Sequence, residues 1–143
     1  MKQEVEKTKG TSTPFILALL LCDSVIVDET SKKKTLVGIF DRILVRRFPS
    51  KHHPITIYAR LTDAEGLYDF RIEYVQIETD KRLAEGKITG VSIPSRLQKH
   101  DLILQPPPVP IPESGEYEFR LWANDRYIGR VSFVAVQVTE KGG

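Results

Sequence analysis

The sequence predicts an all-β protein that folds as a single antiparallel β-sandwich of seven to eight strands. Two observations predict this fold. Runs rich in Val, Ile, Leu, Phe and Tyr recur along the chain and are separated by clusters of turn residues. No long stretch shows the periodicity of an amphipathic helix. Many short strands at regular spacing are typical of a sandwich or a barrel.

One domain is expected, because 143 residues is a common length for a single domain. We predict a flexible polar tail at residues 1–13, a sandwich domain at residues 14–139 and a short tail at residues 140–143. The expected strands lie at residues 15–27, 35–48, 55–62, 67–78, 82–93, 101–109, 116–123 and 127–138.

The first apolar run, Phe15–Cys22, is too short to cross a bilayer, which takes about 20 apolar residues. The core of a secretory signal is the alternative. Against it, the leading residues carry Glu as well as Lys, and no small-residue cleavage site follows. The run is therefore predicted to be a buried strand, and no membrane partner is expected.

Cys22 is the single cysteine, so the chain cannot form an internal disulfide. This fits a reducing compartment and predicts a cytoplasmic protein. A nucleophilic thiolate needs a cation or a helix N-terminus nearby, whereas the neighbour here is Asp23. We expect Cys22 to be a small buried residue of a strand.

Two irregular positions are predicted within the strands. In the run 67–78 the apolar phase slips by one residue at Tyr74–Val75, which indicates a β-bulge or a strand that changes sheets. In the final hairpin, a three-residue loop at Asn124–Arg126 is expected, because a two-residue loop would set Arg130 opposite Phe119 in the core. The three-residue loop predicts the pairs Ala123–Tyr127, Leu121–Gly129, Phe119–Val131 and Tyr117–Phe133.

The proline-rich stretch 105–112 cannot lie inside a sheet, because proline donates no ladder hydrogen bond. We predict an edge or a crossing connection in polyproline II form, with Val109 and Ile111 anchored in the core. A docking peptide for an SH3-like groove is the alternative, and it would need both of these side chains to be free.

No catalytic residue, cofactor or metal site is predicted. The sequence has no phosphate-binding glycine motif, no CxxC, no HExxH and no nucleophile elbow. His52 and His53 precede Pro54 and are interpreted as part of a solvated turn. The formal net charge of +2 gives no electrostatic case for a nucleic acid or a membrane surface.

Charged loop residues are expected at both ends of the sandwich, because alternate connections between crossing strands meet at the same end. One end gathers a basic group that is a candidate anion contact: Arg46, Arg47, Lys51, His52, His53, Lys81 and Arg82. The other end gathers Asp28, Glu29, Asp63, Glu65 and Asp125 with Lys32, Lys33 and Lys34. Loop aspartates suggest calcium, but no Asp-x-Asp spacing supports it. Solvated loops are the simpler interpretation of both ends.

Trp122 and Ile128 are candidate partner contacts. By the phase of the final hairpin both point away from the core and lie opposite each other. Aromatic residues are enriched at interfaces. The alternative is that residues 1–13 or a neighbouring strand cover Trp122.

Three stretches of the chain resemble a family of small bacterial proteins that contain a domain of unknown function. They are Leu19–Val25 followed by Thr35–Phe40, Phe48–Pro49 leading into Ile55–Tyr58, and Gly115–Trp122. The resemblance spans about residues 15–138. It implies a bacterial origin and an immunoglobulin-like sandwich, and it implies no activity.

The sequence thus favours a non-enzymatic module for protein binding or assembly, with an unknown protein partner or a second copy of the chain. Trp122 and Ile128 are its expected contact residues. The alternative is a receptor for an anionic or phosphorylated ligand that uses Arg46, Arg47, Lys51, Lys81 and Arg82.

Overall fold

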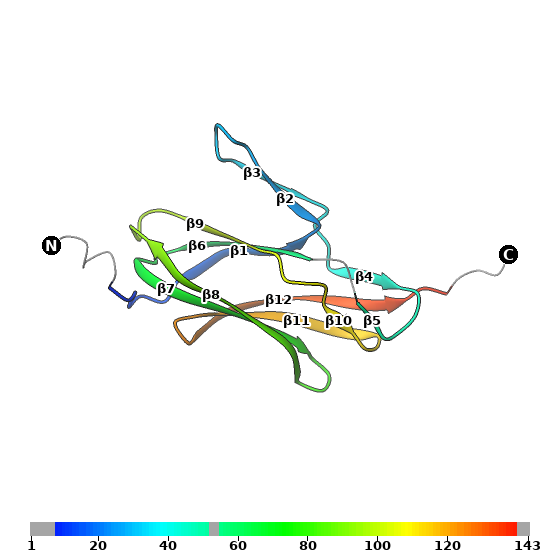
Figure 1. The fold of residues 1–143 in the computed structure, drawn as a ribbon. Coiled ribbons are helices and arrows are strands. Elements are labelled where there is room, and N and C mark those ends of the chain that lie inside the picture. The colour runs from blue at the N-terminus through cyan, green and yellow to red at the C-terminus, as the bar shows by residue number, and fades with distance from the viewer. Residues whose placement is uncertain (1–7, 52–54, 140–143) are drawn as a thin grey trace.

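The structure is a computed structural model that describes residues 8–51 and 55–139. These residues form strands, turns and loops, and none of them is helical. Two sheets lie face to face around the core (Figure 1). The first is three-stranded, with β1 (Phe15–Cys22), β6 (Thr56–Thr62) and β9 (His100–Leu104) in the order β1-β6-β9. The second has five strands in the order β4-β12-β11-β7-β8: β4 (Arg42–Val45), β12 (Arg126–Gln137), β11 (Gly115–Ala123), β7 (Gly66–Gln76) and β8 (Lys81–Ile93).

The predicted fold class is confirmed. The two main sheets hold eight strands, and each lies within or overlaps one of the eight predicted runs. All pairings in these sheets are antiparallel except that of β12 with β4, which is parallel. Two smaller sheets complete the described chain: β2 (Ser24–Val27) pairs with β3 (Lys34–Val37), and β5 (Ser50–Lys51) pairs with β10 (Pro110–Ile111).

The runs 15–27 and 35–48 were each predicted as one strand, and this is wrong. Each run breaks in two, because the chain leaves the sandwich after Cys22 and returns at β4. The break is built from Asp23 and Gly38: Gly38 has φ 69°, and a Cβ there would lie 2.2 Å from Asp23 Oδ2. Only glycine accepts both that backbone and that contact at low cost.

Stacked aromatic rings fill the inner face of the five-stranded sheet. Five ring pairs among Tyr74, Tyr117, Phe119 and Phe133 have centroids 5.0 to 6.3 Å apart, three of them stacked and the two of Phe119 tilted, and all four residues are buried. The two phenol groups are hydrogen-bonded, with Tyr74 donating to the Pro110 carbonyl at 2.8 Å and Tyr117 to the Glu113 carbonyl at 2.5 Å. The cluster therefore joins β7, β11 and β12 and also holds the connection that leads into β11.

In the final hairpin the predicted loop is wrong, whereas the pairs Leu121–Gly129, Phe119–Val131 and Tyr117–Phe133 are confirmed. The predicted pair Ala123–Tyr127 is wrong, because Ala123 pairs with Arg126 and Tyr127 is exposed. The turn has two residues, Asn124 and Asp125, with φ 46° and 65°. Two consecutive positive φ angles match the twist of the flanking strands in a tight hairpin. A β-bulge at Ile128 then restores the register, so Phe119 pairs with Val131 as expected. The prediction did not consider a bulge. The residue inserted at the bulge keeps Arg130 from lying opposite Phe119, although the loop has only two residues.

The bulge predicted at Tyr74–Val75 is confirmed in its place. The register of β7 with β8 shifts there, and the inserted residue is Leu83 on β8. Residues 105–109 of the proline-rich stretch form a crossing connection as predicted, and Pro110–Ile111 form β10 in the two-stranded sheet with β5. Val109 and Ile111 are buried, as predicted. These two side chains are not free, which removes the SH3-docking alternative for this stretch.

The segment before β1 pairs with β7, and Cys22 ends β1. Residues 8–13 were assigned to a flexible tail, but they lie along β7: the N–H of Gly10 donates to the Leu67 carbonyl, and the N–H of Leu67 to the Thr8 carbonyl, both at 2.9 Å. Residues 1–7 and 140–143, together with His52, His53 and Pro54, lie outside the described residues. Cys22 is fully buried at the end of β1, as predicted. Phe15 and Leu17 are exposed, so β1 is buried mainly in its second half.

Truncating a ring of the aromatic cluster should lower the free energy of unfolding more than a substitution at the surface does. Phe133→Ala is expected to lower the free energy of unfolding by about 3–5 kcal/mol, because it leaves a cavity among the stacked rings. Leu97→Ala is the control, since Leu97 is 87% exposed, and a change within about 0.5 kcal/mol is expected for it. Urea denaturation followed by circular dichroism measures both. Equal losses in the two variants would contradict the assigned core.

Candidate functional site

Trp122 lies on the outer face of the five-stranded sheet, as predicted, but neighbouring side chains cover it. Its Nε1–H donates to Glu73 Oε1 at 2.8 Å. The guanidinium of Arg71 sits 4.4 Å from the centre of the ring, in a cation–π arrangement. Tyr127 packs edge-on against it with 5.5 Å between centroids. Trp122 is thus half-buried within its own sheet.

Ile128 does not lie opposite Trp122, so the predicted pair of these two residues is wrong. The bulge at Ile128 places Tyr127 opposite Trp122. Ile128 is partly buried and packs against the core. The sequence missed this because one inserted residue reverses the side-chain face of a strand.

The outer face around Trp122 is a self-neutralising network of two arginines and two glutamates. Arg71 lies 2.7 Å from Glu73 and 3.6 Å from Glu85. Arg82 lies 3.3 Å from Glu73 and 3.6 Å from Glu85. Since each cation faces both anions, the charges of these four side chains balance around Trp122.

The basic group is located at one end of the sandwich but is spread over separate elements. Arg46 and Arg47 follow β4, Lys51 ends β5, and Lys81 and Arg82 begin β8. Arg82 belongs to the outer-face network. In the described part of the chain, no carboxylate pairs with Arg47, Lys51 or Lys81. Binding of an anion by this group stays a prediction.

The second charged end is not assembled as predicted. Asp28 and Glu29 lie at the tip of a projecting hairpin, because β2 leaves the sandwich (Figure 1). Asp63 is instead paired with Arg96 at 2.6 Å, and Asp125 lies in the β11–β12 turn. Within residues 8–51 and 55–139, no group of three or more His, Cys, Asp or Glu side chains is arranged to hold a metal ion.

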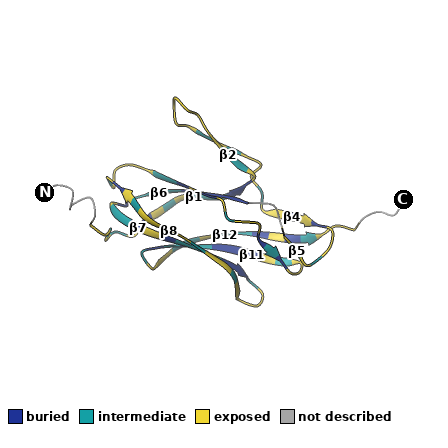
Figure 2. Cartoon of the chain, viewed as in Figure 1, coloured by how far each residue is buried: buried dark blue, intermediate teal, exposed yellow. Residues whose placement is uncertain are grey.

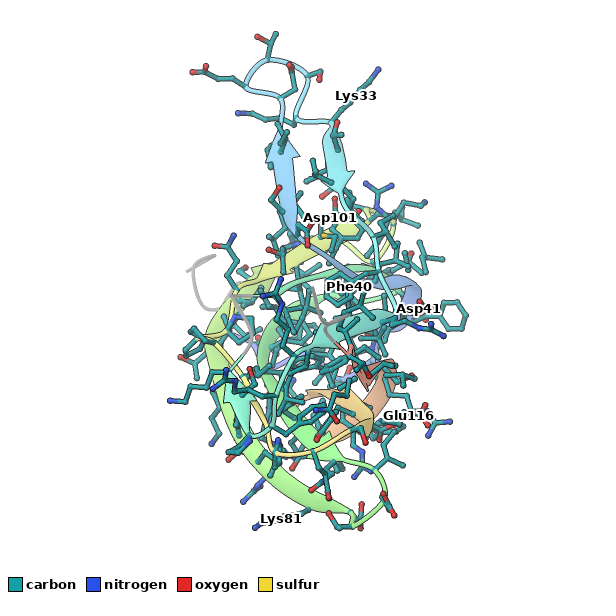
Figure 3. The ribbon with its side chains drawn as sticks, turned by 90° about the vertical axis from the view of Figure 1, so that its right-hand side faces the viewer. Lys33, Phe40, Asp41, Lys81, Asp101 and Glu116 are labelled. Carbon is teal, nitrogen blue, oxygen red and sulfur yellow. The ribbon has the colours of Figure 1, made fainter. Side chains whose placement is uncertain are left out.

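The projecting hairpin is the main surface feature that sequence reasoning missed. We call residues 24–37 the arm. Its strands pair from Ser24 with Val37 to Val27 with Lys34, and it rises from the sandwich with Lys33 near its tip (Figure 3). Asp28 Oδ2 accepts the N–H of Ser31 at 2.7 Å and that of Thr30 at 3.2 Å. These hydrogen bonds lower the pKa of Asp28 and give the tip a defined turn.

Aliphatic side chains are exposed on the arm and at its base. Ile26 is 56% exposed on β2, Ile39 is 58% exposed just after β3, and Leu44 is 61% exposed on β4. Val27 and Val37 are also exposed. Ile39 and Leu44 line one hollow of about 280 Å³ beside Phe40. Figure 2 shows that most of the arm stands clear of the buried core. We call Ile26, Val37, Ile39 and Leu44 the aliphatic strip; Val27 lies on the other face of the hairpin.

A buried carboxylate ties the arm to the sandwich. Asp101 on β9 lies 2.8 Å from Lys34 of the arm and 2.8 Å from Arg60 of β6. Figure 3 places Asp101 where the arm meets the body. Burial acts to raise the pKa of Asp101, but hydrogen bonds from Arg60, Lys34 and Tyr58 outweigh it and hold the pKa well below its usual range. Because Lys34 pairs with Val27 beside the turn, this ion pair ties the tip end of the arm's ladder to the body, while Ile26 and Val37 stay exposed.

Burial and the neighbouring Asp23 raise the pKa of the Cys22 thiol, which disfavours the thiolate. No helix in the described part of the chain is long and apolar enough for a transmembrane span.

Comparisons with known proteins give a family and a fold-level similarity. A model of a family of unknown function, DUF6941, matches residues 17–136. No curated protein is detectably similar in sequence. Among solved structures, an immunoglobulin-like protein from Pseudomonas aeruginosa is 10% identical with a TM-score of 0.40, and the match covers 87% of this chain and 98% of that one.

A second similar structure is the alkylpurine DNA glycosylase AlkC of Pseudomonas fluorescens bound to DNA containing an abasic site analogue. It is 12% identical with a TM-score of 0.45, and the match covers 82% of this chain. This chain corresponds to only 30% of the length of the glycosylase.

The tether at Asp101 makes a pH-dependent contribution to stability. Its folded pKa is depressed, so this stability is complete above the unfolded pKa of about 3.9 and is lost as the pH falls toward the folded value. Asp101→Asn should cost about 1.5–3 kcal/mol at pH 7, the usual contribution of a charged hydrogen bond. The deficit should shrink as the pH falls from about 5 to 2.

Urea denaturation of the wild type and of Asp101→Asn at several pH values measures this deficit. Asp125→Asn is the matched control, because Asp125 is an exposed turn residue with a positive φ that Asn tolerates. A deficit for Asp101→Asn that stays constant across the pH range would rule out the tether as described.

Proposed function

Since the chain belongs to the DUF6941 family, a family of unknown function, we propose its role from its own surface: it is a non-enzymatic module for protein binding or assembly, and the arm is its contact element. This proposal moves the expected contact from Trp122 and Ile128 to the aliphatic strip. The outer face at Trp122 is already occupied by Arg71, Glu73 and Tyr127.

The observation that carries the proposal is an uncovered two-stranded hairpin with aliphatic side chains. An isolated hairpin is at best marginally stable in water, and it gains stability when another layer packs on it. On this arm Ile26 and Val37 lie on one face, because Ser24 is opposite Val37 and residues two apart share a face. Both side chains are exposed. A partner that packs on this face would supply the missing layer.

Exposed aliphatic residues at the base of the arm support the same proposal, that the arm contacts a partner. Exposed aliphatic side chains also occur where the chain returns from the arm, at Ile39 and at Leu44 on the edge strand β4, and these two line one hollow. Clustered exposed aliphatic residues mark interaction sites, whereas scattered ones need no explanation. A second copy of the chain or a different protein are the two kinds of partner, and the experiment below distinguishes them.

The non-enzymatic part of the proposal rests on the sequence, which contains no catalytic or cofactor-binding motif. The cytoplasmic location inferred from the single cysteine also stays a prediction. The alternative function, an anion receptor, would rest on Arg47, Lys51 and Lys81, which have no carboxylate partner among the described residues. It is the weaker proposal, because these three cations lie on different elements.

Removing the aliphatic side chains of one arm face should abolish association. The double variant Ile26→Thr with Val37→Thr keeps a β-branched residue at both positions, so the hairpin itself is retained. Size-exclusion chromatography with light scattering is expected to show the wild type as a dimer or larger species and the double variant as a monomer. Leu97→Ser is the control, since it removes an even more exposed aliphatic side chain, from the loop between β8 and β9.

If the wild type is a monomer, the arm is tested for binding to a different protein. Photo-crosslinking from position 26 in living cells should then yield a defined adduct that the Val37→Thr variant weakens. A monomeric wild type that also gives no adduct from the arm would contradict the proposal.

A further inference from the structure

A second candidate site lies along the open side of the sandwich, at the edge strand β8. An apolar cleft of about 330 Å³ opens between the inner face of β8 and the segment Gln105–Pro110, which connects β9 to β10. Figure 1 shows this segment crossing the open side next to β8. The volume is at the lower end of the range of about 300–1,000 Å³ that is usual for ligand sites.

The cleft exists because β8 has small residues at inward positions. Tyr74 pairs with Ala84, Ile72 with Gly86 and Phe70 with Ile88, and directly opposite residues share a face of the sheet. Ala84 and Gly86 therefore leave the neighbouring β7 side chains uncovered, and all of these residues line the cleft. A Cβ built on Gly86 would meet its nearest atom, Ile72 Cγ2, at 3.4 Å, so there is room for a side chain.

The opposite wall is stiff. Pro106, Pro107 and Pro108 line it, and proline has a fixed φ and no N–H to offer. The wall is also anchored, since Val109 is buried and Tyr74 donates to the Pro110 carbonyl at 2.8 Å. A stiff wall keeps the cleft from collapsing onto β8.

The backbone of β8 is unpaired beside this cleft. β8 is the last strand of its sheet, with β7 on one side. Between Ala84 and Ile88, the amide and carbonyl groups that point away from β7 have no hydrogen-bond partner in the part of the chain that the structure describes. An unpaired edge is a template for an additional strand.

We propose that β8 binds an extended peptide segment of another protein as an added strand, with alternate apolar side chains of the peptide in the cleft. Main-chain hydrogen bonds along an edge and an adjacent pocket for alternate side chains together define this kind of recognition. An apolar pocket alone would suit any small apolar molecule. The coincidence of the pocket with the unpaired edge at Ala84–Ile88 favours a peptide.

The charges along β8 specify the rest of the peptide. The stretch 81–87 carries Lys81, Arg82 and Lys87 against Glu85. Arg82 is paired with Glu85 and Glu73, whereas Lys87 has no ion pair among the described residues. Lys87 alternates with Gly86 and Ile88 and so points to the outer face. The peptide therefore alternates apolar residues with acidic ones, and the acidic residues face Lys87. This site shares no residue with the arm, and it goes beyond the proposed function.

Fluorescence anisotropy with the full chain tests the inference. The probe is a labelled eight-residue peptide of alternating Val and Glu. Two comparison peptides replace Glu by Lys or the central Val by Pro. We expect saturable binding of the Val–Glu peptide, and at least about tenfold weaker binding of the other two, because one opposes Lys87 and the other cannot complete the ladder.

Variants of β8 link binding to the cleft. Gly86→Leu fills the cleft and should weaken the Val–Glu peptide at least about tenfold. Ala84→Leu is the second filling variant, in case the first does not fold. Lys87→Glu should reverse the preference between the Glu and Lys peptides. Arm variant Ile26→Thr is the matched control and should bind all peptides as the wild type does.

Three results would overturn the inference. They are an absence of saturable binding up to millimolar peptide, equal binding of the proline-containing peptide, and unchanged binding by both folded filling variants. If instead dodecanoate binds and is lost in Gly86→Leu while the peptide does not bind, the cleft is a site for small apolar ligands. If the β8 variants change the oligomeric state without affecting the peptide, the occupant is a second copy of this chain. Either outcome excludes the peptide proposal.

Discussion

The stacked aromatic cluster is the interaction on which the rest of the structure depends. Tyr74, Tyr117, Phe119 and Phe133 come from the three central strands of the five-stranded sheet, so their packing aligns β7, β11 and β12. Burial raises the pKa of the Tyr74 phenol, which keeps its proton for the Pro110 carbonyl. That hydrogen bond positions the proline-rich wall. The aromatic cluster thus anchors one wall of the cleft, while the small residues Ala84 and Gly86 of β8 leave the space beside it.

The arm obeys a different constraint, because the core does not reach it. Its stability relies on its own ladder, on its turn at Asp28 and on the ion pair of Lys34 with Asp101. Asp101 is held in the body by Arg60 and pairs with Lys34 at the tip end of the ladder, so the arm is tied to the body along its length. Aliphatic side chains of the arm nevertheless face water. A tethered hairpin with exposed apolar side chains suits a contact element, since little additional ordering is needed when a partner binds.

Much of the fold could be predicted from sequence, because local alternation marks strands well. The eight main strands, the burial of Cys22 and the anchors Val109 and Ile111 follow from apolar runs and proline chemistry. The arm could not be predicted in this way, because the run 15–27 stays apolar while its second half leaves the sandwich. The pairing of Trp122 with Tyr127 was missed for a similar reason, since the bulge at Ile128 has no apolar signal of its own. The small inward residues Ala84 and Gly86 were visible, but nothing local shows that β8 is an edge strand.

Amide hydrogen exchange tests directly whether the arm is a contact element. The full chain is purified from its own cells under mild conditions that retain bound partners. Its amide exchange is compared with that of the same chain refolded alone. The account predicts that amides of residues 24–37 are protected in the native isolate and exchange rapidly in the chain alone, while amides of β11 and β12 are protected equally in both. Equal exchange of the arm in the two preparations would contradict the claim.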